Sequence, residues 1–281
     1  MSHSDLTAKS LRRPLDQQRL AARLEGTRWL AAEVFDSIGS TNEEAAKNAI
    51  PGRVLVASHQ TSGRGRLARP WVAPPHASVA ISVVLPLPVD SAQWGWAPLL
   101  VGIVVRRALA PRAPQVGMKW PNDLLARAED DDEWRKLVGI LCQTSVGPDG
   151  PVLVVGVGIN TDVRLEERPV DTATSLRMLG QPVDDPEDLV ADVLDGLAEV
   201  EQWLHAAPAA LEQHKMAYRR ECLTIGLAVR VETPEGNLEG IAHAIDDAGR
   251  LVVRHAAGDT ALAVGDVVHV RPGAGSGSGW R

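Results

Sequence analysis

Cysteine is scarce in this sequence, and its scarcity excludes two common ways of stabilising a small fold. The 281 residues include two cysteines, Cys142 and Cys222. They lie far apart and lack the paired spacing of metal ligands, so neither a disulfide framework nor a zinc site is expected. We predict that both side chains are small buried hydrophobes in a protein of a reducing compartment.

Long hydrophobic runs are also lacking. The longest apolar run covers residues 77–89, and two prolines interrupt it. A run of this length is too short to span a bilayer, and the N-terminus contains no apolar segment of the kind found in secretory signals. The sequence therefore predicts a cytoplasmic protein with no membrane partner.

The chain has no excess of positive charge, since its formal net charge is −7. A protein of this charge is not a general nucleic-acid binder, because the nucleic-acid backbone attracts basic surfaces. A local basic segment can still hold a phosphate group. We therefore expect no nucleic-acid partner and expect any anion site to lie in a local basic segment.

Turn signals and apolar periodicity indicate an α+β fold beyond residue 28. Ser40-Thr41-Asn42-Glu43 has the form of a capping box, which begins a helix. Asp185-Pro186 begins a long amphipathic helix. Five consecutive acids at 129–133 predict a solvated loop. Strands are predicted at 54–58, 77–85, 115–120, 137–143 and 152–157, and helices at 40–50, 91–110, 185–204 and 209–222.

The same signals divide the chain into four parts. Residues 1–28 carry six Lys and Arg, are too few for a helix-turn-helix domain, and are predicted to form a tail or one loosely packed helix. Residues 29–222 are predicted to form the main domain, which contains the chemical motifs described below. Closely spaced turn signals such as Asp247-Ala248-Gly249 predict that 223–272 form a small β-barrel. Residues 273–281 are a tail rich in Gly and Ser.

The strongest chemical signal is the segment Gly63-Arg64-Gly65-Arg66-Leu67-Ala68-Arg69-Pro70-Trp71, called the arginine loop below. It holds three arginines within six residues, and no acid lies between Val54 and Val89. Arginine binds phosphate or carboxylate through two parallel hydrogen bonds, while glycine lets the backbone approach an anion and adopt a positive φ. An anionic ligand is therefore predicted.

Three further blocks accompany this loop: Lys119-Trp120-Pro121-Asn122-Asp123, Lys136-Leu137-Val138-Gly139-Ile140-Leu141 and Gly156-Val157-Gly158-Ile159-Asn160. Together with the loop and Ser40-Thr41-Asn42, they resemble the biotin–protein ligase family in order and approximate spacing. The resemblance covers residues 29–272. It implies an α+β architecture, with a mixed-sheet catalytic domain of the biotin/lipoate ligase type followed by a small SH3-like β-barrel.

The resemblance also implies a reaction and its participants. Biotin and ATP would react to form biotinyl-AMP and pyrophosphate, with Mg²⁺ as the activating ion. The biotinyl group would then pass to a lysine of a biotin carboxyl carrier protein, or of the carrier domain of acetyl-CoA carboxylase or another biotin-dependent carboxylase. The metal ligands are not specified by the resemblance. Fixed positive charge is needed because the first step brings together two anions that repel each other.

By the same resemblance, Lys136 and Arg66 are the catalytic residues, and Trp71 is available to stack on adenine. Gly139, Gly156 and Gly158 would form the floor and walls of the pocket, where a Cβ would collide with the biotin ring. The residues implied to bind biotin are Ser40, Thr41, Asn42, Gln60, Gly63, Arg64, Arg66, Lys136, Gly139, Ile140, Gly156 and Gly158. Those implied to bind ATP or the adenylate are Arg64, Arg66, Arg69, Trp71, Lys119, Asn122, Asp123, Lys136 and Asn160.

The sequence departs from the family pattern at Ala68, where many members carry glycine. This difference concerns the flexibility of the arginine loop and not its chemistry.

Three alternatives remain open at this point. A lipoate–protein ligase shares the fold and the adenylate chemistry, although the arginine loop and the glycines favour biotin. A biotin-responsive repressor would need roughly 60 further residues for an N-terminal winged helix. A nucleic-acid-binding module would use the arginine loop, but the net charge of −7 disfavours it.

Overall fold

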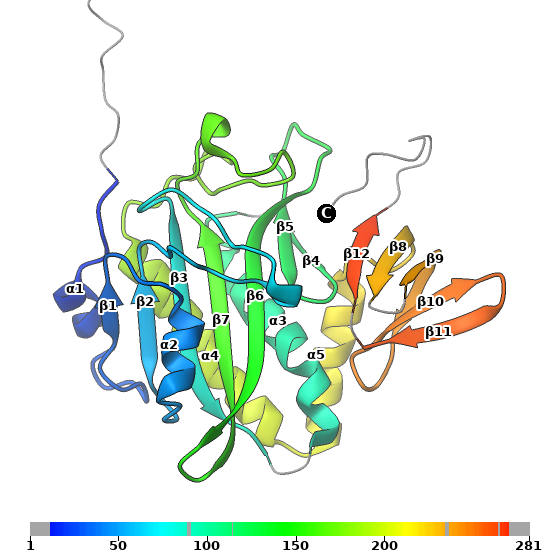
Figure 1. Cartoon of the computed structure of the whole chain (residues 1–281), viewed down its shortest axis with the longest axis horizontal. Coiled ribbons are helices and arrows are strands. Elements are labelled where there is room, and N and C mark those ends of the chain that lie inside the picture. The colour runs from blue at the N-terminus through cyan, green and yellow to red at the C-terminus, as the bar shows by residue number, and fades with distance from the viewer. Residues whose placement is uncertain (1–11, 89–90, 114, 234–235, 264, 270–281) are drawn as a thin grey trace, which may run out of the picture.

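The computed structural model describes residues 12–88, 91–113, 115–233, 236–263 and 265–269. The predicted tail at 273–281 and the first eleven residues of the predicted N-terminal tail lie outside the described residues. A seven-stranded sheet forms the centre of the molecule, and a smaller five-stranded sheet lies beside it (Figure 1).

The large sheet is mixed, with strand order β1-β2-β3-β7-β6-β5-β4. β1 runs parallel to β2, and every other neighbouring pair is antiparallel. The short strands β1 and β5 were not predicted from the sequence. The strands are β1 (Glu33–Phe35), β2 (Val54–Ala57), β3 (Ser78–Pro86), β4 (Val116–Lys119), β5 (Asp123–Ala126), β6 (Arg135–Gly147) and β7 (Gly150–Asn160).

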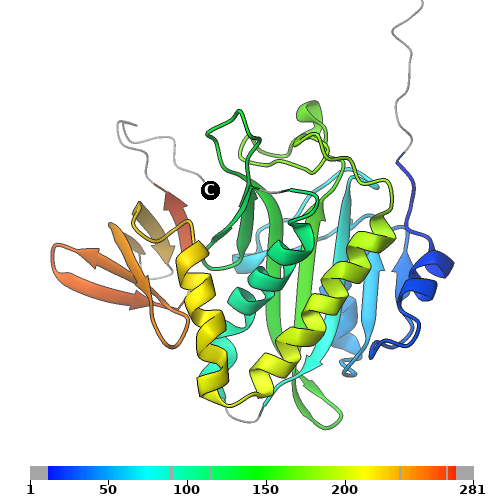
Figure 2. The same ribbon diagram turned by 180° about the vertical axis from the view of Figure 1, so that it is seen from behind.

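Helices cover one face of this sheet and leave much of the other face open for a site. The covering layer contains η2 (Ser91–Trp96), α3 (Ala97–Leu109), α4 (Pro186–His205) and α5 (Pro208–Glu221) (Figure 2). The opposite face carries α2 (Thr41–Lys47), η1 (Arg66–Ala68) and the rest of the arginine loop (Figure 1). η3 (Leu165–Glu167) lies in the connection after β7.

Alternation along β7 explains how one strand serves both faces. Val155, Val157 and Ile159 are buried in the main hydrophobic core, while Gly156 and Gly158 line a cavity on the other face. Successive side chains of a strand point to opposite faces, so apolar residues and glycines alternate along β7, and Val157 belongs to the core while also lining the cavity.

The segment before the large sheet is packed and not loose. In α1 (Gln17–Arg23), Leu20 is fully buried in the main core. Arg13 Nη1 donates to Glu187 Oε1 at 3.0 Å, and the Asp16 backbone N–H donates to the same oxygen at 2.7 Å. Residues 12–28 are therefore held on α4 by burial and by charge-assisted hydrogen bonds.

The small sheet has the antiparallel hairpins that the turn signals predict. Its strands, in the order β11-β10-β9-β8-β12, are β8 (Ala228–Thr233), β9 (Gly236–Ile245), β10 (Leu251–His255), β11 (Gly258–Leu262) and β12 (Asp266–His269). Two indoles of the large domain hold it in place: Trp96 Nε1 donates to Asp247 O at 2.8 Å, and Trp120 Nε1 donates to Gly249 O at 3.0 Å.

The prediction that both cysteines are buried is wrong for one of them. Cys222 is buried as expected, but Cys142 on β6 is only half-buried and packs against the main core. Among the described residues, every helix is either too short or too polar to cross a membrane.

Candidate active site

A cavity of about 700 Å³ lies on the open face of the large sheet. α2, β3, β6, β7 and the arginine loop supply its lining, and the segment 169–173 supplies its rim. Most of the sequence-predicted site residues meet here; Gly63 and Lys119 are the two that do not line the cavity. Those that do are Ser40, Thr41, Asn42, Gln60, Arg64, Arg66, Arg69, Trp71, Asn122, Asp123, Lys136, Gly139, Ile140, Gly156, Gly158 and Asn160.

One end of the cavity is formed by the N-terminus of α2, and we call it the amide end (Ser40, Thr41, Asn42 and Gln60). Ser40 is the N-cap, and its Oγ accepts from the Glu43 backbone N–H at 3.4 Å. Gln60 Oε1 accepts from the Thr41 backbone N–H at 2.8 Å and lies 3.1 Å from Thr41 Oγ1. The predicted N-cap residue Ser40 therefore begins the helix, with the Glu43 side chain paired to Arg64 in place of the reciprocal capping-box contact, and the helix start places three polar side chains on the cavity.

Asn42 is buried and fully hydrogen-bonded at this end. Its Nδ2 donates to Leu141 O at 3.1 Å and to Gln143 Oε1 at 3.0 Å. Its Oδ1 accepts from Ser82 Oγ at 2.6 Å. A Cβ built at Gly156 would lie 2.3 Å from Asn42 Oδ1, so glycine is required there by the packing of Asn42.

The arginine loop adopts positive φ at residues other than those its sequence suggests. Leu67 has φ 52° and Ala68 has φ 57°, whereas Gly63 and Gly65 are not in the left-handed region. Gly63 is needed for close packing instead, because a Cβ would lie 2.7 Å from Trp71 O. Ala68, the position where the sequence departs from the family pattern, thus takes a conformation that favours glycine.

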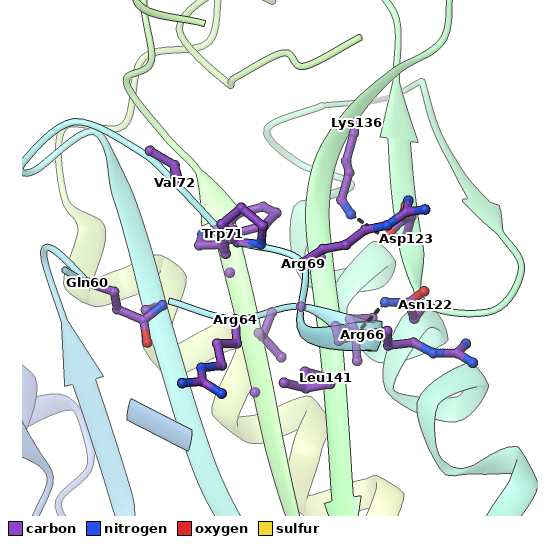
Figure 3. Close-up of a pocket in the computed structure, with 18 of the residues that line it drawn as sticks. Gln60, Arg64, Arg66, Arg69, Trp71, Val72, Asn122, Asp123, Lys136 and Leu141 are labelled. Carbon is purple, nitrogen blue, oxygen red and sulfur yellow. Dashed lines mark hydrogen bonds and ion pairs between the residues drawn. The ribbon is translucent and has the colours of Figure 1, made fainter. Parts of the chain in front are cut away.

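The three arginines of the loop diverge (Figure 3). Arg64 Nε lies 3.0 Å from Glu43 Oε1. Arg69 Nη2 donates to Glu232 Oε2 of β8 at 3.2 Å, which links the loop to the small sheet. Burial lowers the pKa of the Arg66 guanidinium, with Asp123 opposing that effect.

Trp71 lies against the glycines of β6 and β7. A Cβ at Gly139 would lie 2.8 Å from Trp71 Cζ3, and one at Gly158 would lie 2.7 Å from Trp71 Cε2. The sequence assigns these glycines to the biotin ring, but in the structure the indole occupies the space next to them. The buried Trp71 Nε1 has no hydrogen-bond partner in the described part of the chain.

Lys136 lies with Arg66 and Arg69 at the end of the cavity beside Asp123, which we call the cationic end (Figure 3). Its Nζ lies 2.7 Å from Asp123 Oδ1 and 5.6 Å from the centre of the Trp71 ring. Its backbone N–H donates to Thr172 O at 2.7 Å, and its carbonyl accepts from Thr174 N at 2.9 Å. The segment around Thr172, which carries no motif, therefore fixes the backbone of this lysine.

Two asparagines of the predicted nucleotide set donate hydrogen bonds to backbone carbonyls, and the lysine of that set is buried. Asn122 Nδ2 donates to Ile140 O at 2.7 Å, and Asn160 Nδ2 donates to Thr174 O at 3.0 Å. Lys119 is buried behind the cavity, and burial lowers its pKa to about 8.

Several residues of the site escaped prediction from the sequence. Ala80, Ile81, Leu141 and Val157 line the cavity as ordinary strand residues, and the segment 169–173 and Gly265 reach it from separate loops. Leu141 and Val157 stand in the quoted blocks but were assigned no contact, and no local pattern marks the other positions, because only the folded sheet brings them to the cavity.

Fold and site together define a class of protein. Residues 34–160 match the biotin/lipoate A/B protein ligase family, and residues 224–275 match the biotin protein ligase C-terminal domain. The chain belongs to the biotin protein ligase family, and both the predicted resemblance and the predicted fold class are confirmed.

Particular relatives sharpen this result. The chain is 40% identical over 277 residues to the biotin–[acetyl-CoA-carboxylase] ligase of Mycobacterium tuberculosis, covering 93% of this chain and 98% of that protein. It is 28% identical to the bifunctional ligase/repressor BirA of Bacillus subtilis, covering 83% of this chain and 71% of that protein.

Among solved structures, the biotin protein ligase of Aquifex aeolicus in complex with biotin and ATP is 25% identical, with a TM-score of 0.68. The match covers 86% of this chain and 99% of that one.

Proposed function

We propose that this chain is an ATP-dependent biotin protein ligase that forms biotinyl-AMP and transfers the biotinyl group to a lysine of a carrier protein. The observation that carries the proposal is the cavity itself. One end offers neutral hydrogen-bonding groups, and the other gathers Lys136 with Arg66 and Arg69 around Asp123, while Arg64 lines the cavity beside Glu43 of α2. A small acid with a neutral head group, activated by a nucleotide, has this distribution of polarity.

In the first step, a carboxylate oxygen of biotin attacks the α-phosphorus of ATP, and the bond to pyrophosphate breaks. Both reactants are anions, so their approach requires cations that are already in place. Lys136 is suited to this task because its backbone is fixed and its ammonium lies beside Asp123 at 2.7 Å. We assign Lys136 and Arg66 the role of stabilising the charge that develops on phosphate and carboxylate.

In the second step, the amine of the acceptor lysine attacks the acyl carbon, AMP leaves with the bonding electron pair, and the amine loses a proton. The adenylate must be protected from water until the acceptor arrives. We assign that role to the arginine loop, whose arginines and Trp71 line the cavity from its open side.

Substrate contacts follow from the two ends. We assign the biotin head group to Ser40, Thr41, Asn42 and Gln60, and the glycines Gly139, Gly156 and Gly158 to the narrow floor. Nucleotide contacts fall to Arg69, Asn122, Asp123 and Asn160, all of which line the cavity, and Lys119, which is buried outside the lining, would add positive charge near them.

Mg²⁺ is proposed to enter with ATP and shield its phosphates. No group of three or more His, Cys, Asp or Glu that could hold a metal occurs among the described residues. Asp123 and Asp171 do line the cavity. Such a set fits an ion that takes most of its ligands from phosphate and water and one or two from carboxylates.

The acceptor is proposed to be the biotin carboxyl carrier domain of acetyl-CoA carboxylase or another biotin-dependent carboxylase. The relative from Mycobacterium tuberculosis is named for the acetyl-CoA carboxylase reaction. A cytoplasmic location and the absence of a nucleic-acid partner stay predictions, and we further predict that the barrel at 223–272 helps to dock the carrier domain.

The test is incubation with ATP, Mg²⁺, labelled biotin and a purified carrier domain. We expect label on the carrier and release of pyrophosphate, and neither without ATP. Labelled lipoate in a parallel reaction should give no labelled carrier; preferential use of lipoate would contradict the proposal.

A further inference from the structure

A buried hydroxyl lies directly beneath the amide end of the cavity. Ser82 of β3 is 0% exposed and does not itself line the cavity. Its Oγ lies 2.7 Å from Thr41 Oγ1 and 2.6 Å from Asn42 Oδ1. Ser82 thus contacts two of the residues proposed to hold biotin, without being exposed to a ligand.

The direction of these hydrogen bonds can be worked out from groups that can only accept. The Leu141 carbonyl lies 3.1 Å from the Asn42 carboxamide, so the nitrogen of that carboxamide must face it. Asn42 Oδ1 then faces Ser82 and can only accept. The single hydroxyl proton of Ser82 is therefore committed to Asn42.

The orientation of Thr41 and Gln60 follows. Because the Ser82 hydroxyl donates its proton to Asn42, the Thr41 hydroxyl must be the donor in the 2.7 Å hydrogen bond with Ser82 Oγ. The Thr41 backbone N–H faces Gln60 at 2.8 Å and requires an acceptor there, which fixes Gln60 Oε1. Gln60 Nε2 is left as the donor of this side chain, and the Thr41 oxygen keeps its lone pairs.

We infer that Ser82 is a positioning residue that sets the donor and acceptor pattern of the biotin end of the cavity. This inference rests on the proposed function. Without the hydroxyl, the buried Asn42 Oδ1 loses its donor, and the Thr41 proton turns to Gln60 Oε1, 3.1 Å away. The head-group contacts then change, while Lys136 and the arginines keep theirs.

The test compares Ser82→Ala with Ser78→Ala in the full-length chain. Ser78 is buried on the same strand, four residues away, and does not line the cavity. Ser82→Ala should weaken biotin binding, measured by calorimetry, about tenfold, since an unpaired buried polar group is costly. The KM for ATP at saturating biotin should change less than about twofold. Ser78→Ala should change neither constant.

Two further variants test the inference in other ways. Ser82→Cys retains a weak donor of similar shape and should restore part of the biotin affinity. Should Ser82→Ala fail to fold, Gln143→Leu alters the exposed end of the same chain of hydrogen bonds and should still weaken biotin binding selectively.

An unchanged biotin Kd in these variants, or equal changes in biotin Kd and ATP KM, would overturn the positioning role. If the wild-type chain bound no biotin, the proposed function itself would fail, which separates the two conclusions.

Discussion

At the amide end of the cavity, Asn42 is 5% exposed and each polar atom of its carboxamide has a partner, whereas in the arginine loop that lines the same cavity the side chains of Arg64 and Arg69 are 58% and 42% exposed. The neutral end can be built into the core because hydrogen bonds offset its burial. Cations have no such option, since burying an unpaired charge is far more costly. The arginines therefore remain near water or near carboxylates that a phosphate can replace.

The comparison predicts that function depends most on the cation with the best-fixed backbone. Lys136→Ala should slow formation of biotinyl-AMP by about 10- to 100-fold or more, because a charge-assisted contact is worth about 1.5–3 kcal/mol before transition-state effects are added. Pyrophosphate release measures this rate.

The thermal midpoint of Lys136→Ala should stay close to that of the wild type, because the side chain is 30% exposed and adds little to the core. Lys47→Ala, which removes an exposed lysine paired with Glu44, is the matched control. Near wild-type adenylate formation by a folded Lys136→Ala chain would contradict the assignment.

Lys119 is an exception to the rule that the cations of this region are exposed, because it is buried. Its pKa falls from the ordinary value to about 8 through burial. Lys119→Met should therefore raise the free energy of unfolding at about pH 7 by about 2–3 kcal/mol, at the expense of ATP affinity. Urea unfolding and the KM for ATP measure the two effects.

The pH dependence of Lys119 has a defined sign. Between about pH 8 and the ordinary lysine pKa, the unfolded chain binds more protons than the folded one, so wild-type stability gains a contribution as pH rises through this window. Lys119→Met should lack that contribution. Identical pH profiles of the two chains would show that the lysine is not desolvated.

Gly158 tests whether the position of Trp71 matters for the ligand. In Gly158→Ala, the new methyl would lie 2.7 Å from the indole, so Trp71 must move. Overpacking of this kind costs about 1–3 kcal/mol, and biotin affinity should fall about tenfold. Gly102→Ala is the control, because its Cβ would lie 3.6 Å from Met118 Sδ and meet ordinary contact. Equal biotin affinity in both variants would exclude a role for Trp71.

Much of the fold could be predicted because each long element shows a local pattern. The helix beginning at Asp185-Pro186 has an apolar stripe along its length, and the structure places α4 at 186–205. β5 was not predicted, because its sequence Asp123-Leu124-Leu125-Ala126 contains none of the β-branched or aromatic residues that indicate a strand. Packing of the segment 12–28 was missed for a different reason: its partner Glu187 lies more than 150 positions away.

The site residues that stand in sequence motifs could be predicted, whereas those that act through contacts with residues distant in the sequence could not. The arginine loop and Lys136 stand in recognisable blocks, and they meet in one cavity. Ser82 and the segment around Thr172 carry no motif, since their effect depends on hydrogen bonds across the sheet. The use of Gly63 and Gly158 for packing, and the positive φ of Ala68, likewise required three-dimensional contacts.

Ala68 offers a smaller test at the cationic end. Its φ of 57° is strained for any residue with a Cβ, so Ala68→Gly should stabilise this loop conformation by about 1 kcal/mol. The measured quantity is the rate at which labelled adenylate escapes, which should fall a few-fold. Ala128→Gly, in a loop position without positive φ, should give no such gain. Faster escape from Ala68→Gly would mean that loop flexibility outweighs the relief of strain.

The smallest expected effect concerns the link between the arginine loop and the small sheet. Arg69 and Glu232 are 3.2 Å apart and both partly exposed, and pairs of this kind contribute about 0.2–1 kcal/mol. Glu232→Gln keeps the shape and removes the charge, so it should change the KM for ATP by about twofold or less, and the difference should shrink as salt is added. Asp259→Asn, which disrupts the exposed Arg254 pair elsewhere on the small sheet, is the matched control and should leave the KM unchanged. A large, salt-independent effect of Glu232→Gln would show that the small sheet holds the arginine loop in place and is more than a surface neighbour of it.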